Sequence, residues 1–496
     1  MPETADIALY TAAQVRELDR TAIEVHGIPG YELMCRAGAA LARQVQAGWP
    51  GAEAVLILCG PGNNGGDGYV LARLLVQAGR AVQVLAMTDP ERLRGDARRA
   101  ADDFRAAGGN IGRFSGALPA GSALLVDALL GTGLDRVVEG EYRIAIEAIN
   151  RDPAPKLAVD IPSGLHADSG RELGAAVVAH TTVTFIGRKR GLYTGRGPAC
   201  AGRVVFDDLA VPAQTYSACE SQVRLLGRAL PETSLRPRAA DAHKGDFGHV
   251  LVVGGAPGMP GAARLAAEAA ARSGAGLVSV ATHAAHAAVL NNGRPELMVR
   301  AVDAPAQLAD LLARATVVAV GPGLGRGAWG RALFEQVLES GLPLVVDADA
   351  LNCLAADPLK RDDWVLTPHP GEAARLLQSA SAAVQADRFA AVTELQARYG
   401  GVAVLKGAGT LVAGGGVPLR LCALGNPGMA SGGMGDVLTG VIAALRAQGL
   451  APLEAACSGV CLHAGAADAL AATRGERGLL AGDLIPEIRR LLNERR

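Results

Sequence analysis

The chain has 496 residues, of which half are apolar and only 3% aromatic, and its 48 Lys and Arg nearly balance its 49 Asp and Glu. A chain of this length exceeds a single hydrophobic core, so we expect at least two domains. The balanced charge excludes the basic surface that nucleic-acid binding requires and leaves small molecules as the expected partners.

The eight cysteines are scattered and include no CxxC pair, so we expect buried free thiols of a reducing cytosol and no zinc site. The N-terminal segment is acidic and lacks the apolar core of a signal peptide. The longest charge-free run, 273–293, contains His, Asn and Ser, and we expect it to form a helix–strand–helix segment that does not span a membrane. These features predict a cytoplasmic protein without a membrane segment, which we also expect to be a homo-oligomer.

The first elements along the chain predict a nucleotide-binding type of unit. Thr11 and Gln14 have the spacing of a helix-capping box. Residues 54–60 (AVLILCG) predict a buried strand, residues 61–68 (PGNNGGDG) a polar glycine loop, and residues 69–79 an amphipathic helix. This order is typical of dinucleotide-binding turns, but the glycine spacing differs from G-x-G-x-x-G, so an ordinary turn remains an alternative.

Two further apolar strands end in polar loops, at residues 123–136 and 156–170. Asp127 ends the first strand, Asp160 ends the second, and Ser163 follows in the same loop. A single acid at a strand end is often a helix cap, but three such loops in an open α/β sheet predict a ligand site. Oxygen ligands without Cys or His suit K⁺, Na⁺ or Mg²⁺.

The strings GPGNNGGDG, VDALLGTG and VDIPSG together resemble the NAD(P)H-hydrate epimerase domain, over about residues 10–215. The resemblance implies a Rossmann-like domain that interconverts the R and S forms of hydrated NAD(P)H and holds K⁺ through Asn64, Asp127 and Ser163. The implied contacts to the hydrated nucleotide are Asn63, Asn64, Gly65, Gly66, Asp67, Gly131, Thr132, Gly133, Leu134, Asp135, Arg136, Val137, Tyr142 and Asp160. Asp160 is the predicted catalytic proton-transfer group, because epimerising a carbinolamine carbon requires proton movement.

The apolar periodicity breaks between residues 215 and 235, where Pro, Ser, Arg and Thr alternate. Within this stretch, residues 223–227 (VRLLG) predict at most one short strand. We therefore expect two domains, residues 1–222 and residues 226–496.

The second half repeats a strand followed by a polar or glycine-rich loop, which predicts a parallel sheet between helices. An Ala-rich helix is expected at residues 257–276. The predicted strand–loop units are residues 243–255, 277–282, 315–325, 342–352, 363–372 and 402–410.

Several of these loops carry side chains with two interpretations. The string GPGLG at 321–325 serves either as a turn or as a set of amide donors. For one of Asp347 and Asp349 we expect only an Asx-turn or a helix N-cap. His369 stands between two prolines, where it is either structural or able to stack on or hydrogen-bond a substrate, and Glu372 is expected to cap the following helix.

Two further features indicate phosphate chemistry. Lys406 follows a strand and precedes glycines, which makes it a candidate point-charge contact to phosphate. Residues 426–440 (NPGMASGGMGDVLTG) place glycines directly before an apolar helix, with Asp436 as the single acid. Such a helix start binds anions through its amides and dipole, and an acid there can act as a general base or simply as an N-cap.

The strings HKGDFG, GMPGAA, GPGLG, DADALN, TPHPGE, LKGAGT and GNPGMASGGMGD resemble the ribokinase-like superfamily and, within it, the ADP-dependent NAD(P)H-hydrate dehydratase domain, over about residues 228–493. The resemblance implies ADP as co-substrate, Mg²⁺, and Asp436 as the catalytic base. The implied contacts to the hydrated substrate are Ala263, Gly323, His369 and Asp436, and those to the adenine nucleotide are Lys406, Gly407, Ala408, Gly409, Thr410 and Gly435.

The predicted fold class is α/β in two domains, an N-terminal Rossmann-like parallel sheet and a C-terminal ribokinase-like α/β sandwich. The predicted function is repair of hydrated NAD(P)H, by epimerisation in the first domain and nucleotide-dependent dehydration in the second. The alternative is a ribokinase-like small-molecule kinase fused to a nucleotide-binding sensor domain.

Overall fold

The computed structural model describes residues 7–227, 235 and 237–494. The chain divides into two units, Ala8–Val223 and a second unit that begins at Arg224. The strands β1 (Ile7–Leu9) and β9 (Val223–Leu225) lie where the units divide, and β9 confirms the short strand predicted at 223–227. Most of the predicted linker beyond it lies outside the described residues.

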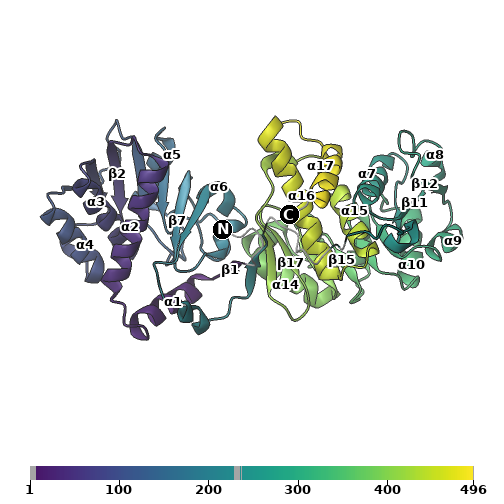
Figure 1. The fold of residues 1–496 in the computed structure, drawn as a ribbon, viewed down its shortest axis with the longest axis horizontal. Coiled ribbons are helices and arrows are strands. Elements are labelled where there is room, and N and C mark those ends of the chain that lie inside the picture. The colour runs from purple at the N-terminus through teal and green to yellow at the C-terminus, as the bar shows by residue number, and fades with distance from the viewer. Residues whose placement is uncertain (1–6, 228–234, 236, 495–496) are drawn as a thin grey trace. The chain divides into compact units, whose positions relative to one another are not determined.

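The first unit is a parallel α/β sheet in the order β4-β3-β2-β5-β6-β7-β8, which confirms the predicted fold class (Figure 1). Its strands are β2 (Ala54–Cys59), β3 (Ala81–Ala86), β4 (Ile111–Arg113), β5 (Leu124–Ala128), β6 (Lys156–Val159), β7 (Thr181–Phe185) and β8 (Arg203–Asp207). Its helices are α1 (Ala12–Glu24), α2 (Gly30–Gly48), α3 (Asn63–Gln77), α4 (Gly95–Ala106), α5 (Gly140–Arg151) and α6 (Gly197–Ala201), with 3₁₀ turns η1 (Pro90–Arg92), η2 (Arg190–Tyr193) and η3 (Ala213–Ala218).

The central strand β2 is buried on both faces, which explains its unbroken apolar run. Val55 and Ile57 pack with α2 and α3, whereas Leu56 and Leu58 pack on the other face with α5. The strand order reverses between β2 and β5, and the crevice at such a switch point is the usual ligand site of an open α/β sheet. The loops with the predicted site residues follow these two strands and β6.

One predicted boundary is wrong. Residues 63–68 are not a loop but the first turns of α3. Their glycines are required by close packing: a Cβ on Gly65 would lie 2.0 Å from the carbonyl oxygen of Gly60, and one on Gly66 would lie 2.5 Å from the side chain of Met34. The predicted capping box is confirmed, since Thr11 Oγ1 accepts from the Gln14 amide at 3.2 Å and Gln14 Oε1 accepts from the Thr11 amide at 2.9 Å.

The second unit has a sheet in the order β18-β17-β16-β15-β14-β13-β10-β11-β12. Its strands are β10 (His249–Val253), β11 (Leu277–Thr282), β12 (Met298–Ala301), β13 (Val317–Val320), β14 (Leu344–Val346), β15 (Trp364–Leu366), β16 (Val402–Leu405), β17 (Thr410–Ala413) and β18 (Leu419–Cys422). Its helices are α7 (Pro260–Arg272), α8 (Ala284–Ala287), α9 (Ala309–Leu312), α10 (Ala328–Glu339), α11 (Ala348–Ala356), α12 (Pro370–Leu376), α13 (Ser381–Ala386), α14 (Arg388–Tyr399), α15 (Met434–Ala447), α16 (Pro452–Arg474) and α17 (Ala481–Asn493), with 3₁₀ turns η4 (Lys244–Phe247), η5 (Pro305–Leu308) and η6 (Pro427–Met429).

From β16 to β12 the strands are parallel, as predicted, but β17 and β18 add an antiparallel meander that the pattern did not predict. In Figure 1, α7 lies beside α15, and α16 and α17 lie beside them. These four helices bury one face of the sheet in a single apolar core. Gly440 lets α15 approach α7 closely, because a Cβ there would lie 2.0 Å from the Ala266 carbonyl oxygen.

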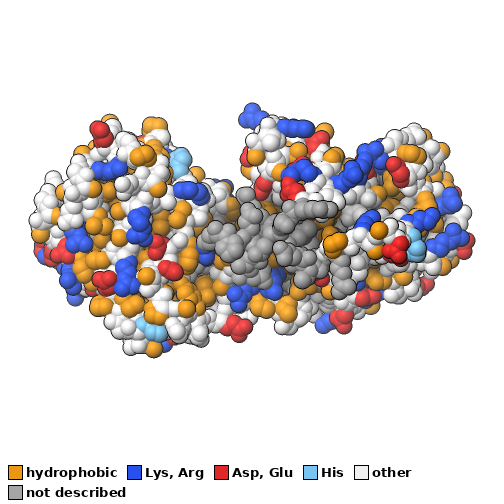
Figure 2. Space-filling view, viewed as in Figure 1, with side chains coloured by type: hydrophobic (Ala, Val, Ile, Leu, Met, Phe, Trp, Pro, Cys, Tyr) orange, Lys and Arg blue, Asp and Glu red, His pale blue; other side chains and the backbone are white. Residues whose placement is uncertain are grey.

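Among the described residues, α16 is the one helix long and apolar enough to cross a bilayer by length and composition, and 67% of its most apolar window is buried in the unit. All eight cysteines are free, as predicted, but the prediction that they are buried holds for only four of them, since the other four are partly exposed. On the face shown in Figure 2, basic and acidic side chains are interspersed among hydrophobic ones and form no single-sign surface.

Candidate active sites

The first unit contains a cavity of about 880 Å³ at the carboxyl ends of its central strands. Its walls come from α1, the start of α3, the loop after β5 and the residues that follow β6 and β7. Most of the residues expected to contact a hydrated nucleotide line it, namely Asn63, Asn64, Asp67, Gly131, Thr132, Gly133, Leu134, Asp135, Arg136, Val137, Tyr142 and Asp160. Gly65 and Gly66 are buried in α3 and do not line the cavity.

Asn64, Asp127 and Ser163 meet around the backbone of Leu130. Ser163 Oγ donates to Asp127 Oδ1 at 2.6 Å, and the Ser163 amide donates to Asp127 Oδ2 at 2.8 Å. The Leu130 amide donates to Ser163 Oγ at 2.8 Å, and its carbonyl accepts from Asn64 Nδ2 at 3.2 Å. The structure thus gathers carboxylate, hydroxyl, amide and carbonyl oxygens in one buried place.

This oxygen cluster fits a monovalent cation. Asp127 is 1% exposed and is bonded by the neutral donors Ser163 and Leu129. Burial raises the pKa of Asp127 to about 6, although the Ser163 hydrogen bonds oppose the shift. A cation held by these oxygens would compensate the buried charge, and hard oxygen ligands are those that K⁺ and Na⁺ accept.

Asp160 lies in a strained position beside a buried lysine. Its φ angle is +64°, a left-handed value that is uncommon outside glycine. Its Oδ1 accepts from Lys189 Nζ, from Thr184 Oγ1 at 3.2 Å and from the Phe185 amide at 3.1 Å. Lys189 is 1% exposed, and its Nζ also donates to Thr184 Oγ1 and to the Phe185 carbonyl oxygen.

Two charged side chains that line this cavity, Lys189 and Asp19, were not among the predicted site residues. Lys189 follows β7 inside the basic string GRKR, which reads as a solvated surface turn. Asp19 lies in the middle of the amphipathic helix α1 and has no motif around it. No motif or strand predicted from the sequence includes either residue.

In the second unit, α15 begins with the glycine turn that the sequence analysis singled out. Gly433 stands at the N-cap with φ +89°, which glycine adopts without strain, and Asp436 lies in the first turn. A Cβ on Gly435 would lie 3.1 Å from Lys406 Nζ and 3.4 Å from Asp347 Oδ2. The lysine and the buried aspartate therefore lie directly against the start of α15.

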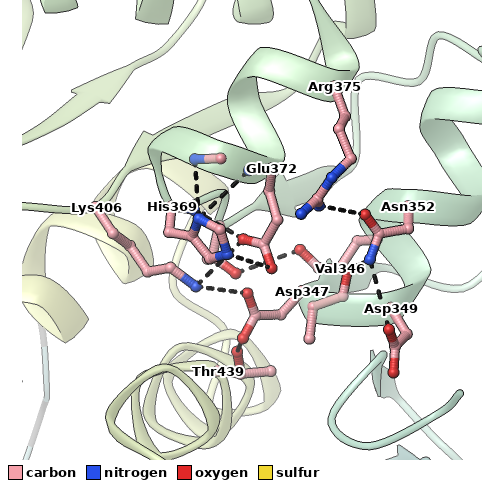
Figure 3. A network of polar contacts seen from close by, with 12 residues as sticks. Val346, Asp347, Asp349, Asn352, His369, Glu372, Arg375, Lys406 and Thr439 are labelled. Carbon is pink, nitrogen blue, oxygen red and sulfur yellow. Dashed lines mark hydrogen bonds and ion pairs between the residues drawn. The ribbon is translucent and has the colours of Figure 1, made fainter. Parts of the chain in front are cut away.

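A chain of polar contacts joins three strand-end loops to α15 (Figure 3). Lys406 Nζ, after β16, donates to Asp347 Oδ1 at 2.7 Å, and Thr439 Oγ1 of α15 donates to Asp347 Oδ2 at 2.9 Å. Lys406 Nζ also lies 3.8 Å from Glu372 Oε2. Asp347 is 1% exposed and the Lys406 side chain is 19% exposed, so this ion pair is largely buried, with its acid fully so.

The expectation that one of Asp347 and Asp349 is only a turn or cap residue is wrong. Asp347 occupies the N-cap position of α11 but makes no capping hydrogen bond, because its carboxylate is engaged by Lys406 and Thr439. Asp349 Oδ2 accepts from the Gly325 amide at 2.9 Å and so fixes the GPGLG loop.

His369 and Glu372 form a capping box on α12, which confirms the expected capping role of Glu372. His369 Nδ1 accepts from the Gly371 amide at 2.9 Å, and Glu372 Oε2 accepts from the His369 amide at 2.8 Å. The His369 side chain is half exposed, so its ring presents a face beside Glu372 and Lys406 (Figure 3).

The pKa values of two carboxyl groups in this site are raised to near neutral pH. Burial raises the pKa of Asp436 to about 7, the charge of Asp347 adds to the shift, and Lys406 opposes it. Burial likewise raises the pKa of Glu372 to about 7. Although burial opposes both shifts, Lys406 lowers the pKa of Asp347 and Asp347 raises the pKa of Lys406. Asp436 is therefore a carboxyl that can exchange a proton near pH 7.

The other residues predicted for this site lie in the loop from Lys406 to Thr410, at Gly323 and at Ala263. In the loop from Lys406 to Thr410, the guanidinium of buried Arg388 lies 3.3 Å from the carbonyl oxygens of Leu405, Lys406 and Gly409, a contact that no sequence signal indicated. Gly323, with φ +58°, packs against the Met259 carbonyl oxygen. Ala263 of α7 is fully buried in the core of the unit.

Two family models match the chain. The model described as NAD(P)H-hydrate dehydratase matches residues 250–490, and the model described as YjeF-related protein N-terminus matches residues 30–191. A bifunctional NAD(P)H-hydrate repair enzyme of Coxiella burnetii is 50% identical over 485 residues, which cover 98% of this chain and 99% of the relative. Its Escherichia coli counterpart is 44% identical over 492 residues, which cover 99% and 95%.

Among solved structures, a ribokinase-like superfamily protein of Enterococcus faecalis is 29% identical, with a TM-score of 0.51. The match covers 55% of this chain and 95% of that protein. It therefore extends over about one of the two units.

The buried ion pair leads to a stability prediction. Asp347→Asn removes one charge and leaves Lys406 buried, so we expect the free energy of unfolding of the second unit to fall by roughly 3 kcal/mol or more. Asp349→Asn, which weakens one hydrogen bond to a backbone amide, should cost about 1 kcal/mol. Urea unfolding followed by the fluorescence of Trp329 and Trp364, in a Trp49→Phe background, measures both values. Equal losses for the two variants would contradict the assigned role of the pair.

Proposed function

The chain belongs to the bifunctional NAD(P)H-hydrate repair enzymes, with an epimerase domain followed by a nucleotide-dependent dehydratase domain, and we propose below which of its residues perform the two reactions. The relatives of that name span nearly the whole chain, so the alternative of a small-molecule kinase fused to a sensor domain is not favoured. The cytoplasmic location and the homo-oligomeric state stay predictions, as do the proposed domain limits of 1–222 and 226–496.

In the second unit, we propose that the S form of hydrated NAD(P)H is phosphorylated on its ring hydroxyl at the expense of ADP. Hydroxide is a poor leaving group and phosphate a good one, so phosphoryl transfer followed by elimination restores the ring double bond. The single observation that carries this proposal is the position of Asp436, a buried carboxyl in the first turn of a glycine-started helix, next to Lys406 and Asp347.

In this mechanism Asp436 takes the hydroxyl proton as the substrate oxygen attacks the terminal phosphorus of the nucleotide. The amides of Gly433, Met434 and Gly435 and the dipole of α15 would stabilise the charge on the phosphoryl oxygens. Lys406, held by Asp347, adds a fixed positive charge beneath that helix start. The nucleotide would extend along the loop from Lys406 to Thr410. Arg388 stabilises this loop through hydrogen bonds to its carbonyl oxygens.

The proposed divalent cation is Mg²⁺, and the donor set fits it. Glu372 and Asp436 are carboxyls whose pKa values burial raises to about 7, and a cation beside them would favour their ionised forms. When bound, Mg²⁺ would neutralise charge on the nucleotide phosphates. In the first unit, Asn64, Asp127 and Ser163 are the proposed ligands of K⁺, on the strength of their buried oxygen cluster.

For the epimerase reaction we propose that Asp160 accepts the proton of the carbinolamine hydroxyl. Its Oδ1 accepts hydrogen bonds from Lys189, Thr184 and Phe185, and its Oδ2 accepts no hydrogen bond from the described residues. The residues around the cavity from Asn63 to Asp67 and from Gly131 to Val137 would enclose the rest of the hydrated nucleotide.

The catalytic role of Asp436 is tested by Asp436→Asn. We expect this variant to bind adenine nucleotide as the wild type does and to lose S-hydrate dehydration by about 10²-fold or more, because the amide cannot accept the hydroxyl proton. NAD(P)H absorbance measures dehydration, and the epimerase activity of the same chain serves as the internal control. Turnover of the S hydrate at the wild-type rate would refute the role.

The pH dependence of dehydration follows from the same residue. The pKa of Asp436 is raised from 3.8 to about 7, so below pH 7 the carboxyl is protonated and cannot act as a base. The rate with saturating ADP should therefore rise with pH to a plateau, with a midpoint at or below about 7, because Mg²⁺ beside Asp436 favours the ionised carboxyl. Initial rates between pH 5.5 and 8.5 measure the profile, and a rate that falls across this range would contradict the assignment.

A further inference from the structure

Asp19 of α1 faces the epimerase cavity without a structural task. It lines the same cavity as Asp160, Asp67 and Lys189. Its carboxyl forms no hydrogen bond or ion pair with any other residue in the described part of the chain, although it is partly buried and the apolar side chains of Val15, Ile23 and Met34 also line the cavity. A desolvated carboxyl without a partner costs stability, and such groups concentrate at functional sites.

Asp160, in contrast, is fixed as a proton acceptor. Its Oδ1 accepts hydrogen bonds from three donors. Lys189 Nζ in turn donates to Asp160 Oδ1, to Thr184 Oγ1 and to the Phe185 carbonyl oxygen. The three donors leave Oδ2 as the oxygen of Asp160 that accepts no hydrogen bond from the described residues and is open to the substrate hydroxyl. The cavity therefore has an assigned base but no assigned acid.

Epimerisation at a carbinolamine carbon needs both a proton acceptor and a proton donor. When the hydroxyl proton leaves, the C–O bond becomes a carbonyl and the C–N bond breaks, so the ring nitrogen must receive a proton. Rotation of the open chain exposes the other carbonyl face, and the reverse steps close the ring with each proton returned to its donor. The balance requires one group that accepts and a second group that donates.

We propose that Asp19 is this second proton-transfer group, donating to the ring nitrogen on opening and recovering the proton on closure, while Asp160 serves the hydroxyl. The inference rests on the proposed epimerase role of Asp160. It assigns a direct contact with the reacting ring to α1, a helix that carries none of the predicted site residues.

The electrostatics agree with this assignment. Burial raises the pKa of Asp19 to about 6; Lys189 opposes the shift, and Asp160 adds to it. Burial, with smaller contributions from Asp160 and Asp19, raises the pKa of Asp67 well above its usual range, and Lys189 opposes the shift.

The charged and titratable side chains on and around α1 also belong to the surroundings of Asp19. Arg16 of the same helix also lines the cavity, and the 3₁₀ turn η3, which packs against α1, carries no charged side chain. The titratable residue of η3, Tyr216, donates to the Ile186 carbonyl oxygen at 2.8 Å.

The test is Asp19→Asn in the full chain, with R-to-S conversion followed by chromatographic separation of the two forms after subtraction of the uncatalysed rate. We expect kcat to fall about 10²-fold or more with KM changed less than about threefold, because the amide occupies the same volume but cannot donate a transferable proton. The wild type should lose activity as the pH rises through about 6, and this falling limb should be absent in the variant. Asp19→Glu, which keeps the carboxyl, should retain the limb.

The matched control is Glu17→Gln, which removes one negative charge from the solvent-facing side of the same helix and should leave epimerisation unchanged. The fluorescence of Trp49 reports whether the first unit of each variant is folded, and S-hydrate dehydration reports on the second. A wild-type chain that does not accelerate R-to-S conversion refutes the proposed epimerase function itself. If the wild type is active and Asp19→Asn either retains its rate or changes only KM, the role of Asp19 alone is refuted.

Discussion

The second unit depends on one buried ion pair, between Lys406 after β16 and Asp347 after β14. Taking two charges out of water is costly, and the cost is offset only when the pair is well bonded, as Asp347 is by Thr439 of α15. The pair therefore ties two strand ends to the start of α15 and sets the position of Gly435 and Asp436 above it. Burial and the charge of Asp347 raise the pKa of Asp436 to about 7 against the opposing effect of Lys406, and at that value Asp436 can act as a base.

The first unit also contains an ion pair between a lysine and a strand-end carboxylate, but the carboxylate has a different role. A buried lysine, Lys189, again neutralises a carboxylate at a strand end, but here the partner is Asp160, the proposed base itself. The two units thus place a lysine-bound carboxylate next to a second carboxyl whose pKa burial raises, Asp436 in one unit and Asp19 in the other. Separating the protonation of two neighbouring carboxyls is how one site comes to hold both an acid and a base.

Much of the fold was predictable because it follows from local pattern. The apolar run of β2, the capping box of Thr11 and Gln14 and the glycine start of α15 all have short-range physical causes. The start of α3 was mispredicted because its glycines are required by close packing against Gly60 and Met34, and a local sequence pattern does not show such packing. Lys189, Asp347 and Arg388 were missed as site residues for the same reason: each acts on a partner that only the tertiary structure brings close, such as Lys406, 59 residues beyond Asp347.

The central claim is that one chain epimerises hydrated NAD(P)H and dehydrates its S form with a nucleotide. The most direct measurement incubates the purified chain with a mixture of R and S hydrates and ADP, ATP or neither, and follows NAD(P)H absorbance. Complete conversion of both forms with ADP is the predicted result. Conversion that stops at the S share of the mixture would contradict the epimerase activity, and no conversion with either nucleotide would contradict the account as a whole.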